Sequence, residues 1–143
     1  MRCFNKSSEG RSYKKLDNPE NMKFWQKGLK SYKLLYGISG EKGAQMELEY
    51  QMGKRNMVLI ETITENKFPA KFHADYDTKG VHNIQKSIFH ELDENTTRWE
   101  SNCEYHFSGF GIKLMPFAFK KQLKKYLVDF KNFAEKGIFV ENN

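Results

Sequence analysis

The last third of the chain joins a regularly alternating segment to one long amphipathic segment. Apolar and polar side chains alternate from residue 97 to 107, which predicts a strand with one apolar face. That face carries Trp99, Cys103, Tyr105 and Phe107. After a glycine turn, residues 112–136 predict a helix with an apolar stripe. The stripe consists of Leu123, Tyr126, Leu127, Phe130, Phe133 and Ala134. Such a helix needs a large apolar surface to lie against, and a curved sheet gripping it usually leaves a cavity.

The earlier part of the chain predicts further strands joined by short breaks. Each is a run of alternating or β-prone residues, and most breaks between them carry Gly, Pro, Asp or Asn. The predicted strands are 31–36, 45–52, 56–65, 71–78 and 81–92. Short strands joined by tight turns indicate an antiparallel meander. With the final helix, this meander predicts an α+β fold.

A tight turn at Gly53 and Lys54 sets the register of two of these strands. The register pairs Tyr50 with Met57, Leu48 with Leu59, and Met46 with Glu61. It therefore places Glu61 on the apolar face, where a carboxyl has a raised pKa and can act as a general acid or base. If the register differs by one residue, Glu61 is solvated instead. No second acid, histidine or nucleophile is predicted beside it, so whether the protein is an enzyme stays open.

A helix-start signal precedes the strands. Asn18 can cap a helix, and Pro19 fits its first position. Met22, Trp25 and Leu29 follow at helical spacing, which predicts a short helix up to about Gly28.

Length and composition bound the class of protein. A chain of 143 residues fits one domain. No apolar run approaches the ~18 residues of a membrane span, and the start has no stretch of signal-peptide length, so we expect a cytoplasmic protein without a transmembrane segment. Two cysteines, Cys3 and Cys103, make no disulfide framework. The net charge of +6 is interpreted as a soluble basic surface, so no nucleic-acid partner is expected.

Three motifs carry a resemblance to a known superfamily: Asp17–Trp25, Ile60–Glu65 and Asn95–Trp99. With the order of elements over residues 16–135, they resemble the SRPBCC (START-like) superfamily, most of all its small bacterial polyketide cyclase/dehydrase-like or lipid-transport-like members. The resemblance implies a single START-like domain over residues 1–143 with the helix-grip fold. In that fold a curved antiparallel sheet of six or seven strands wraps around a long C-terminal helix, with short helices near the N-terminus. The space between sheet and helix usually holds a hydrophobic ligand.

One part of the chain departs from the superfamily's pattern. Members begin with an alternating strand, whereas residues 1–15 are polar and poorly patterned. The first strand is therefore either short and degraded, over residues 2–6, or missing. Its loss would leave the backbone of Trp99 to Phe107 partly unpaired, which predicts a weakened fold or a homodimer formed at that edge.

The candidate pocket residues are those that the strand faces and the helix stripe direct toward each other. They are Met46, Leu48, Tyr50, Leu59, Glu61, Phe72, Tyr76, Trp99, Tyr105, Phe107, Leu123 and Leu127. The leading hypothesis is binding or transport of a hydrophobic small molecule, such as a lipid, polyketide or aromatic metabolite, without a cofactor. One alternative is a polyketide cyclase or dehydratase-like enzyme that uses Glu61 or a pocket tyrosine. A second is a protein-interaction module that uses the basic helix or an exposed sheet edge.

Metal binding is not expected. His73, Asp75 and Asp77 alternate on a strand face that looks outward, and no cysteine pair or closely spaced histidine pair occurs. The final helix carries a lysine-rich face that we interpret as solvated. Its members are Lys120, Lys121, Lys124 and Lys125.

Overall fold

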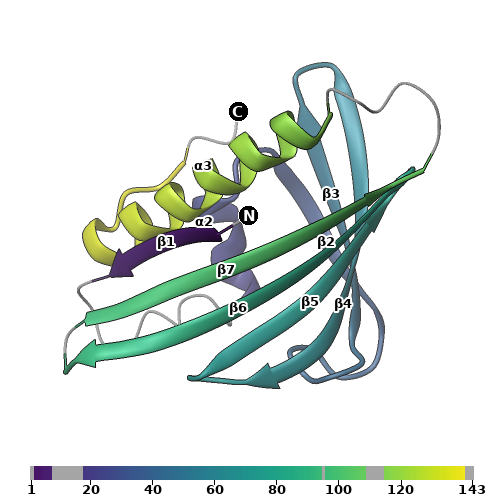
Figure 1. Cartoon of the computed structure of the whole chain (residues 1–143). Coiled ribbons are helices and arrows are strands. Elements are labelled where there is room, and N and C mark those ends of the chain that lie inside the picture. Colours follow the sequence, from purple (N-terminus) through teal and green to yellow (C-terminus); the bar gives the residue numbers. More distant parts are fainter. Residues whose placement is uncertain (1, 8–17, 95, 109–114, 141–143) are drawn as a thin grey trace.

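The computed structural model describes the backbone of residues 2–7, 18–94, 96–108 and 115–140. It also describes their side chains, apart from residues 2–7, 52, 115–120 and 123. Figure 1 shows a curved sheet with a long helix, α3 (Met115–Lys136), lying across its concave side. The sheet has seven antiparallel strands in the order β1-β7-β6-β5-β4-β3-β2. This is the predicted α+β arrangement.

The strands follow the predicted meander with modest extensions. Their bounds are β1 (Arg2–Ser7), β2 (Leu29–Tyr36), β3 (Gln45–Met52), β4 (Arg55–Lys67), β5 (Lys71–Thr78), β6 (Val81–Asp93) and β7 (Thr96–Phe107). The turn between β3 and β4 has two residues, and its Gly53 takes a positive φ of 62°. A tight turn of this kind favours glycine and fixes the register. The three predicted pairs across β3 and β4, including Met46 with Glu61, are confirmed.

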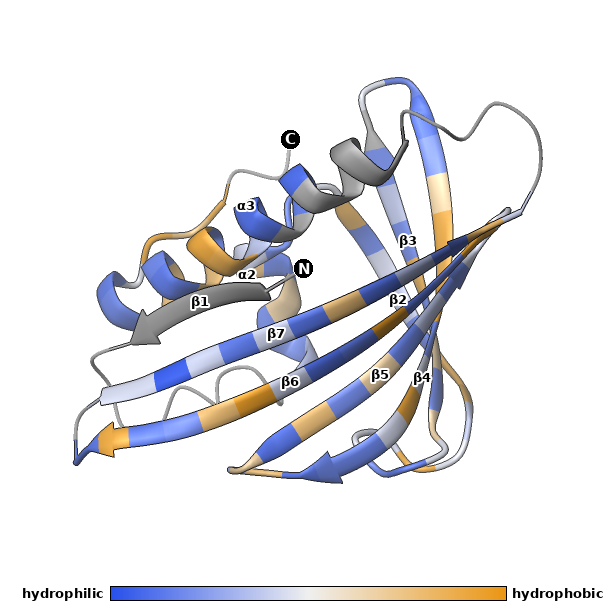
Figure 2. Ribbon diagram, in the orientation of Figure 1, coloured by the Kyte–Doolittle hydropathy of each residue, from blue (hydrophilic) through white to orange (hydrophobic). Residues whose placement is uncertain are grey.

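The inner face of the sheet alternates with an outer face along each strand. Figure 2 shows this as bands of hydrophilic and hydrophobic residues along β6 and β7. In β7 the buried positions are Thr97, Trp99, Ser101 and Cys103, which are spaced by two residues. On α3 the buried positions include Leu127, Phe130, Phe133 and Ala134. These two sets belong to opposite walls of the interior, as the strand and helix periodicities predicted.

The predicted N-terminal helix is shorter than its sequence pattern indicated. A 3-10 turn, η1 (Pro19–Asn21), leads into α2 (Met22–Trp25), where the helix ends. The predicted extension to about Gly28 was wrong, because α2 ends at Trp25 and Leu29 already begins β2, where it pairs with Tyr50. The Gly28 carbonyl accepts a hydrogen bond from the Gln51 amide at 2.7 Å, so sheet pairing replaces helical pairing. Asn18 caps η1 as predicted, since its side chain accepts from the Glu20 amide.

The first strand is present. β1 pairs with β7 from Arg2 opposite Asn102 to Ser7 opposite Thr97. The alternative of a missing strand was therefore wrong, and β1 occupies the edge along which a homodimer was predicted. The backbone ladder explains this result, because strand pairing uses main-chain N–H and C=O groups and does not require alternating side chains.

The chain after α3 folds back onto α2. The Val140 amide donates to the Phe24 carbonyl at 2.9 Å, and the Phe139 ring lies 4.7 Å from the Phe24 ring between centroids. Phe133 of α3 packs against the same pair of rings. This three-ring cluster ties the end of α3 to the short helix that borders the interior.

Candidate functional site

Two adjoining cavities lie between the sheet and the helices. The first has a volume of about 100 Å³ and the second about 130 Å³. Both are lined predominantly by apolar surface. They share a wall formed by Trp25, Gln26, Tyr76, Gln85 and Trp99. The helix α2 supplies one side of this wall, and β5, β6 and β7 supply the other.

Most of the candidate pocket residues line one or both cavities. The first cavity is lined by Met46, Glu61 and Phe72. The second is lined by Tyr50, Leu59, Tyr105 and Leu127. Tyr76 and Trp99 border both. Two candidates lie elsewhere. Leu48 is fully buried in the core, and Phe107 lines neither cavity, its ring stacking on Tyr105 with centroids 6.1 Å apart. The side chain of Leu123 lies outside the described residues.

Glu61 points into the first cavity. It lies opposite Met46 on β3 and opposite Tyr76 on β5, as the predicted register required. Glu61 is half-buried and lines the first cavity. Burial raises the pKa of Glu61, and a hydrogen bond with Tyr76 partly opposes that rise. The alternative of a solvated Glu61 was therefore wrong.

Tyrosine hydroxyls supply the neutral polar groups of the site. The Tyr50 hydroxyl donates to Gln26 Oε1 inside the core. Burial raises the pKa of both Tyr50 and Tyr76 well above the usual range, and it raises that of Tyr126 as well. These hydroxyls therefore stay protonated and act as hydrogen-bonding groups rather than as anions.

Three buried polar atoms around the cavities have no hydrogen-bond partner among the described residues. They are Trp25 Nε1, Trp99 Nε1 and Asn83 Oδ1. Both indoles belong to residues that border both cavities, and each residue is 7% exposed. A buried donor without an acceptor costs about 1–3 kcal/mol, so an acceptor atom placed in the cavity beside either indole would recover that energy.

Sequence reasoning missed the polar residues of the shared wall and of β6. Gln26 sits next to Trp25 at the end of α2, and Asn83 and Gln85 point inward from β6. A signal for the strand residues was present. Tyr76 pairs with Asn83 and Ala74 with Gln85, so the inward position of β5 residues carries over to β6. Gln26 has no comparable signal, because the helix around it was predicted too long.

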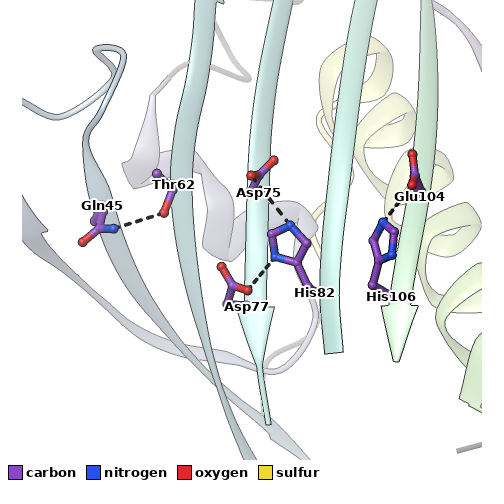
Figure 3. A network of polar contacts seen from close by, with 7 residues as sticks. All are labelled: Gln45, Thr62, Asp75, Asp77, His82, Glu104 and His106. Carbon is purple, nitrogen blue, oxygen red and sulfur yellow. Dashed lines mark hydrogen bonds and ion pairs between the residues drawn. The ribbon is translucent and has the colours of Figure 1, made fainter. Parts of the chain in front are cut away.

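The histidines lie on the outer face of the sheet. Figure 3 shows His82 of β6 between Asp75 and Asp77 of β5, and His106 of β7 beside Glu104. His82 Nδ1 is 2.6 Å from Asp77 Oδ1 and His82 Nε2 is 3.8 Å from Asp75 Oδ2. Within the described ranges, no group of three or more His, Cys, Asp or Glu residues is arranged to hold a metal ion.

The lysine-rich face of α3 is exposed to solvent where its side chains are described. Lys121, Lys124 and Lys125 are exposed, and Lys125 Nζ forms an ion pair with Asp129 at 2.5 Å. Lys120 lies outside the described side chains. Among the described residues, no helix combines the length and apolar character needed to cross a membrane.

Solved structures of other proteins identify the fold of this chain. No protein-family model matches the sequence, and no curated protein matches it significantly. Solved structures do match. Ara h 8.0201 superimposes with a TM-score of 0.79 at 10% identity, over 94% of this chain and 95% of that one. Major latex-like protein 151 from Panax ginseng gives 0.71 at 14% identity, over 94% and 95%.

A third match is the di-domain ARO/CYC StfQ from the steffimycin biosynthetic pathway. Its TM-score is 0.79 at 10% identity, and the match covers 96% of this chain and 45% of StfQ. The chain therefore has the helix-grip fold that the resemblance implied. Identities this low establish the architecture and leave the chemistry of the site to be argued from its own residues.

Proposed function

We propose that this protein binds a small hydrophobic molecule in the two cavities between the sheet and the helices. The observation that carries the proposal is that the sheet and helices border space which the described side chains do not fill. Protein interiors are close-packed, and voids larger than a water molecule are few. Cavities with a mostly apolar lining and a few convergent polar groups are the usual form of a small-molecule site.

The volumes limit the size of the ligand. A cavity of about 150 Å³ lined by apolar side chains can hold one benzene molecule. The two cavities, of about 100 and 130 Å³, are each close to that size. A molecule of one or two rings therefore fits with small movements of the shared wall, whereas a long acyl chain requires the helices to move. Among lipids, polyketides and aromatic metabolites, this geometry favours compact aromatic compounds.

The lining supports an aromatic ligand. Trp25 and Trp99 border both cavities, and Phe68 and Phe72, which stack at 5.3 Å, line the first. Aromatic rings stack on or meet one another edge to face with a gain beyond area burial. The site draws on residues from Pro19 to Leu127, which also supports a single domain. Location in the cytoplasm stays a prediction.

The test is binding of a neutral two-ring probe, 1-naphthalenemethanol, measured by titration calorimetry. Native mass spectrometry of the purified protein would show any retained ligand. Leu59→Trp adds bulk to the second cavity and should weaken binding at least tenfold. The matched control is Val58→Trp, because Val58 is the preceding residue of β4, points outward and is 45% exposed. It should leave the affinity within twofold.

Two results would contradict the proposal. One is the absence of both a retained molecule and measurable probe binding. The other is equal loss of affinity in the two tryptophan variants, which would place the probe outside the cavity.

Proton transfer is the second candidate function, and the Glu61–Tyr76 pair favours it. A carboxyl with a raised pKa beside a neutral hydroxyl can accept and return a proton within the first cavity. A cyclase- or dehydratase-like reaction would use such a group. Glu61→Gln should then reduce the rate on a polyketide-like substrate at least 100-fold. An unchanged rate would remove Glu61 from any catalytic role.

A further inference from the structure

Glu61 is the one acidic side chain that lines either cavity among the described residues, and no described Lys, Arg or His lines them. The fixed charge available to a ligand is therefore negative or zero. The chain as a whole carries a net charge of +6, whereas the charge on the described lining of the cavities is negative or zero. A charge of this kind inside a cavity selects the charge of what binds there.

The carboxyl of Glu61 has room for another partner. A carboxylate offers about four acceptor positions, and the Tyr76 hydroxyl, from the paired position on β5, can fill one of them. Met46, Ile63 and Phe72 surround the same cavity with apolar surface. An ionised carboxyl in such surroundings is costly unless a cation pairs with it.

Aromatic rings around the first cavity add to the attraction for a cation. Trp25, Phe68, Phe72, Tyr76 and Trp99 all line it. The faces of aromatic rings carry negative potential and attract ammonium groups, and Trp does so most strongly. The carboxyl and the rings therefore favour the same ligand chemistry.

We propose that the site selects a compact hydrophobic amine, whose ammonium group pairs with the Glu61 carboxylate while its rings occupy the adjoining cavity. This inference rests on the proposed function and narrows it. Two other ligand classes fit less well. A hydrophobic carboxylic acid brings a second negative charge to Glu61, and a neutral alcohol satisfies one acceptor position without pairing the charge.

The test uses three compounds that share a naphthalene ring. They are 1-naphthylmethylamine, 1-naphthalenemethanol and 1-naphthoic acid, titrated by calorimetry into the full chain at pH 7.5. We expect the amine to bind at least tenfold more tightly than the alcohol and at least 100-fold more tightly than the acid. Glu61→Gln should weaken amine binding at least tenfold and leave alcohol binding within threefold.

A second variant and a pH series make the test independent of how well Glu61→Gln folds. Glu65→Gln removes an outward carboxyl from the same strand and should change none of the three affinities. In the unmodified protein, amine affinity should rise as the pH is raised from 4.5 and Glu61 ionises, while alcohol affinity stays constant. The other titratable groups that face these cavities are Tyr50, Tyr76, Tyr105 and Tyr126, and phenols stay protonated over this range.

The outcomes separate this inference from the proposed function. If the alcohol binds in the cavity and the amine binds no more tightly, or the acid binds as well as the amine, the amine preference is wrong and ligand binding stands. If a preference for the amine persists in Glu61→Gln, the counter-ion is another group and the inference is also wrong. If none of the three compounds binds, both proposals are overturned.

Discussion

The Glu61 carboxyl and the Tyr76 hydroxyl stand on directly paired positions of β4 and β5, and both residues line the first cavity, where each shifts the pKa of the other. The pairing has two electrostatic consequences. Burial raises the pKa of both groups, and the nearby carboxyl raises that of Tyr76 further. The hydroxyl therefore stays protonated, whereas the protonation of the carboxyl depends on pH and on what occupies the cavity.

Replacing Glu61 should change how stability depends on pH. Because its folded-state pKa is raised, the folded protein keeps this proton at pH values where the unfolded chain has released it. Stability is therefore lost as pH rises from 4.5 through the raised pKa. Glu61→Gln removes this loss, so its free energy of unfolding in urea should exceed that of the parent at pH 8 and approach it at pH 4.

Glu65 provides a control of opposite sign on the same strand. Hydrogen bonds from Lys71 and Lys67 hold the pKa of its carboxyl below the usual range. Its contribution is present above pH 4.5 and lost as pH falls. Glu65→Gln should therefore be less stable than the parent at pH 7, with the difference shrinking on acidification. Parallel pH profiles for the two variants would contradict the assignment of Glu61 to the interior.

Two histidines on the outer face should titrate on opposite sides of the ordinary histidine value. The hydrogen bond to Asp77 raises the pKa of His82 above 6.5, and Asp75 adds to the rise. Partial burial lowers the pKa of His73 below 6.5, against an opposing pull from Glu65. Two-dimensional NMR titration of the imidazole carbons would measure both.

Asp77→Asn tests the cause of the His82 shift. It should return the His82 midpoint toward 6.5 and leave that of His73 unchanged, because His73 pairs with Glu65 and not with Asp77. Asp75 also contacts His82, and His106 and Glu104 face it from β7, so a midpoint that does not move in this variant would assign the shift to these neighbours.

Trp99 should tolerate replacement by phenylalanine better than its burial indicates. Its ring packs against Phe89 at 5.7 Å and Phe130 at 5.4 Å, so Trp99→Ala should lower the free energy of unfolding by about 3–5 kcal/mol. Trp99→Phe keeps an aromatic ring and removes the unpartnered Nε1 donor. Relief of that donor offsets the lost volume, so the change should be under about 1 kcal/mol by urea unfolding. A loss above about 3 kcal/mol would show that the donor is satisfied.

The sequence predicted the architecture well where the alternation of side chains and the geometry of a turn require the same register. Strict alternation in residues 45–52 and the glycine turn after it determined the register that placed Glu61 inside. The pocket lining followed from that register for most candidates, but Leu48 shows the limit of the method, since an inward residue can pack as core as easily as it can line a cavity. Which inward residues border empty space depends on how α3 and α2 sit over the sheet. Periodicity carries no information on that placement.

The predictions for the first strand and the first helix went wrong for a different reason. β1 is held by main-chain pairing with β7, which leaves no side-chain signature in residues 2–7. At Leu29 the apolar spacing continued the helical pattern, yet the backbone had already joined β2. Burial of Leu29 satisfied both interpretations, so hydrophobic spacing alone could not distinguish them.

The glycine at this helix-to-strand junction yields the last prediction. Gly28 has a φ of 90°, and a Cβ added there would lie 2.7 Å from the Gln51 carbonyl oxygen. Gly43 has nearly the same φ, 88°, but an added Cβ would meet nothing within 4 Å. Gly43→Ala should therefore show backbone strain alone, of about 1–3 kcal/mol, and Gly28→Ala a clearly larger loss of unfolding free energy. Because Gln26 and Trp25 precede Gly28, its substitution should also weaken probe binding, whereas equal losses in the two variants would show that Gln51 moves aside.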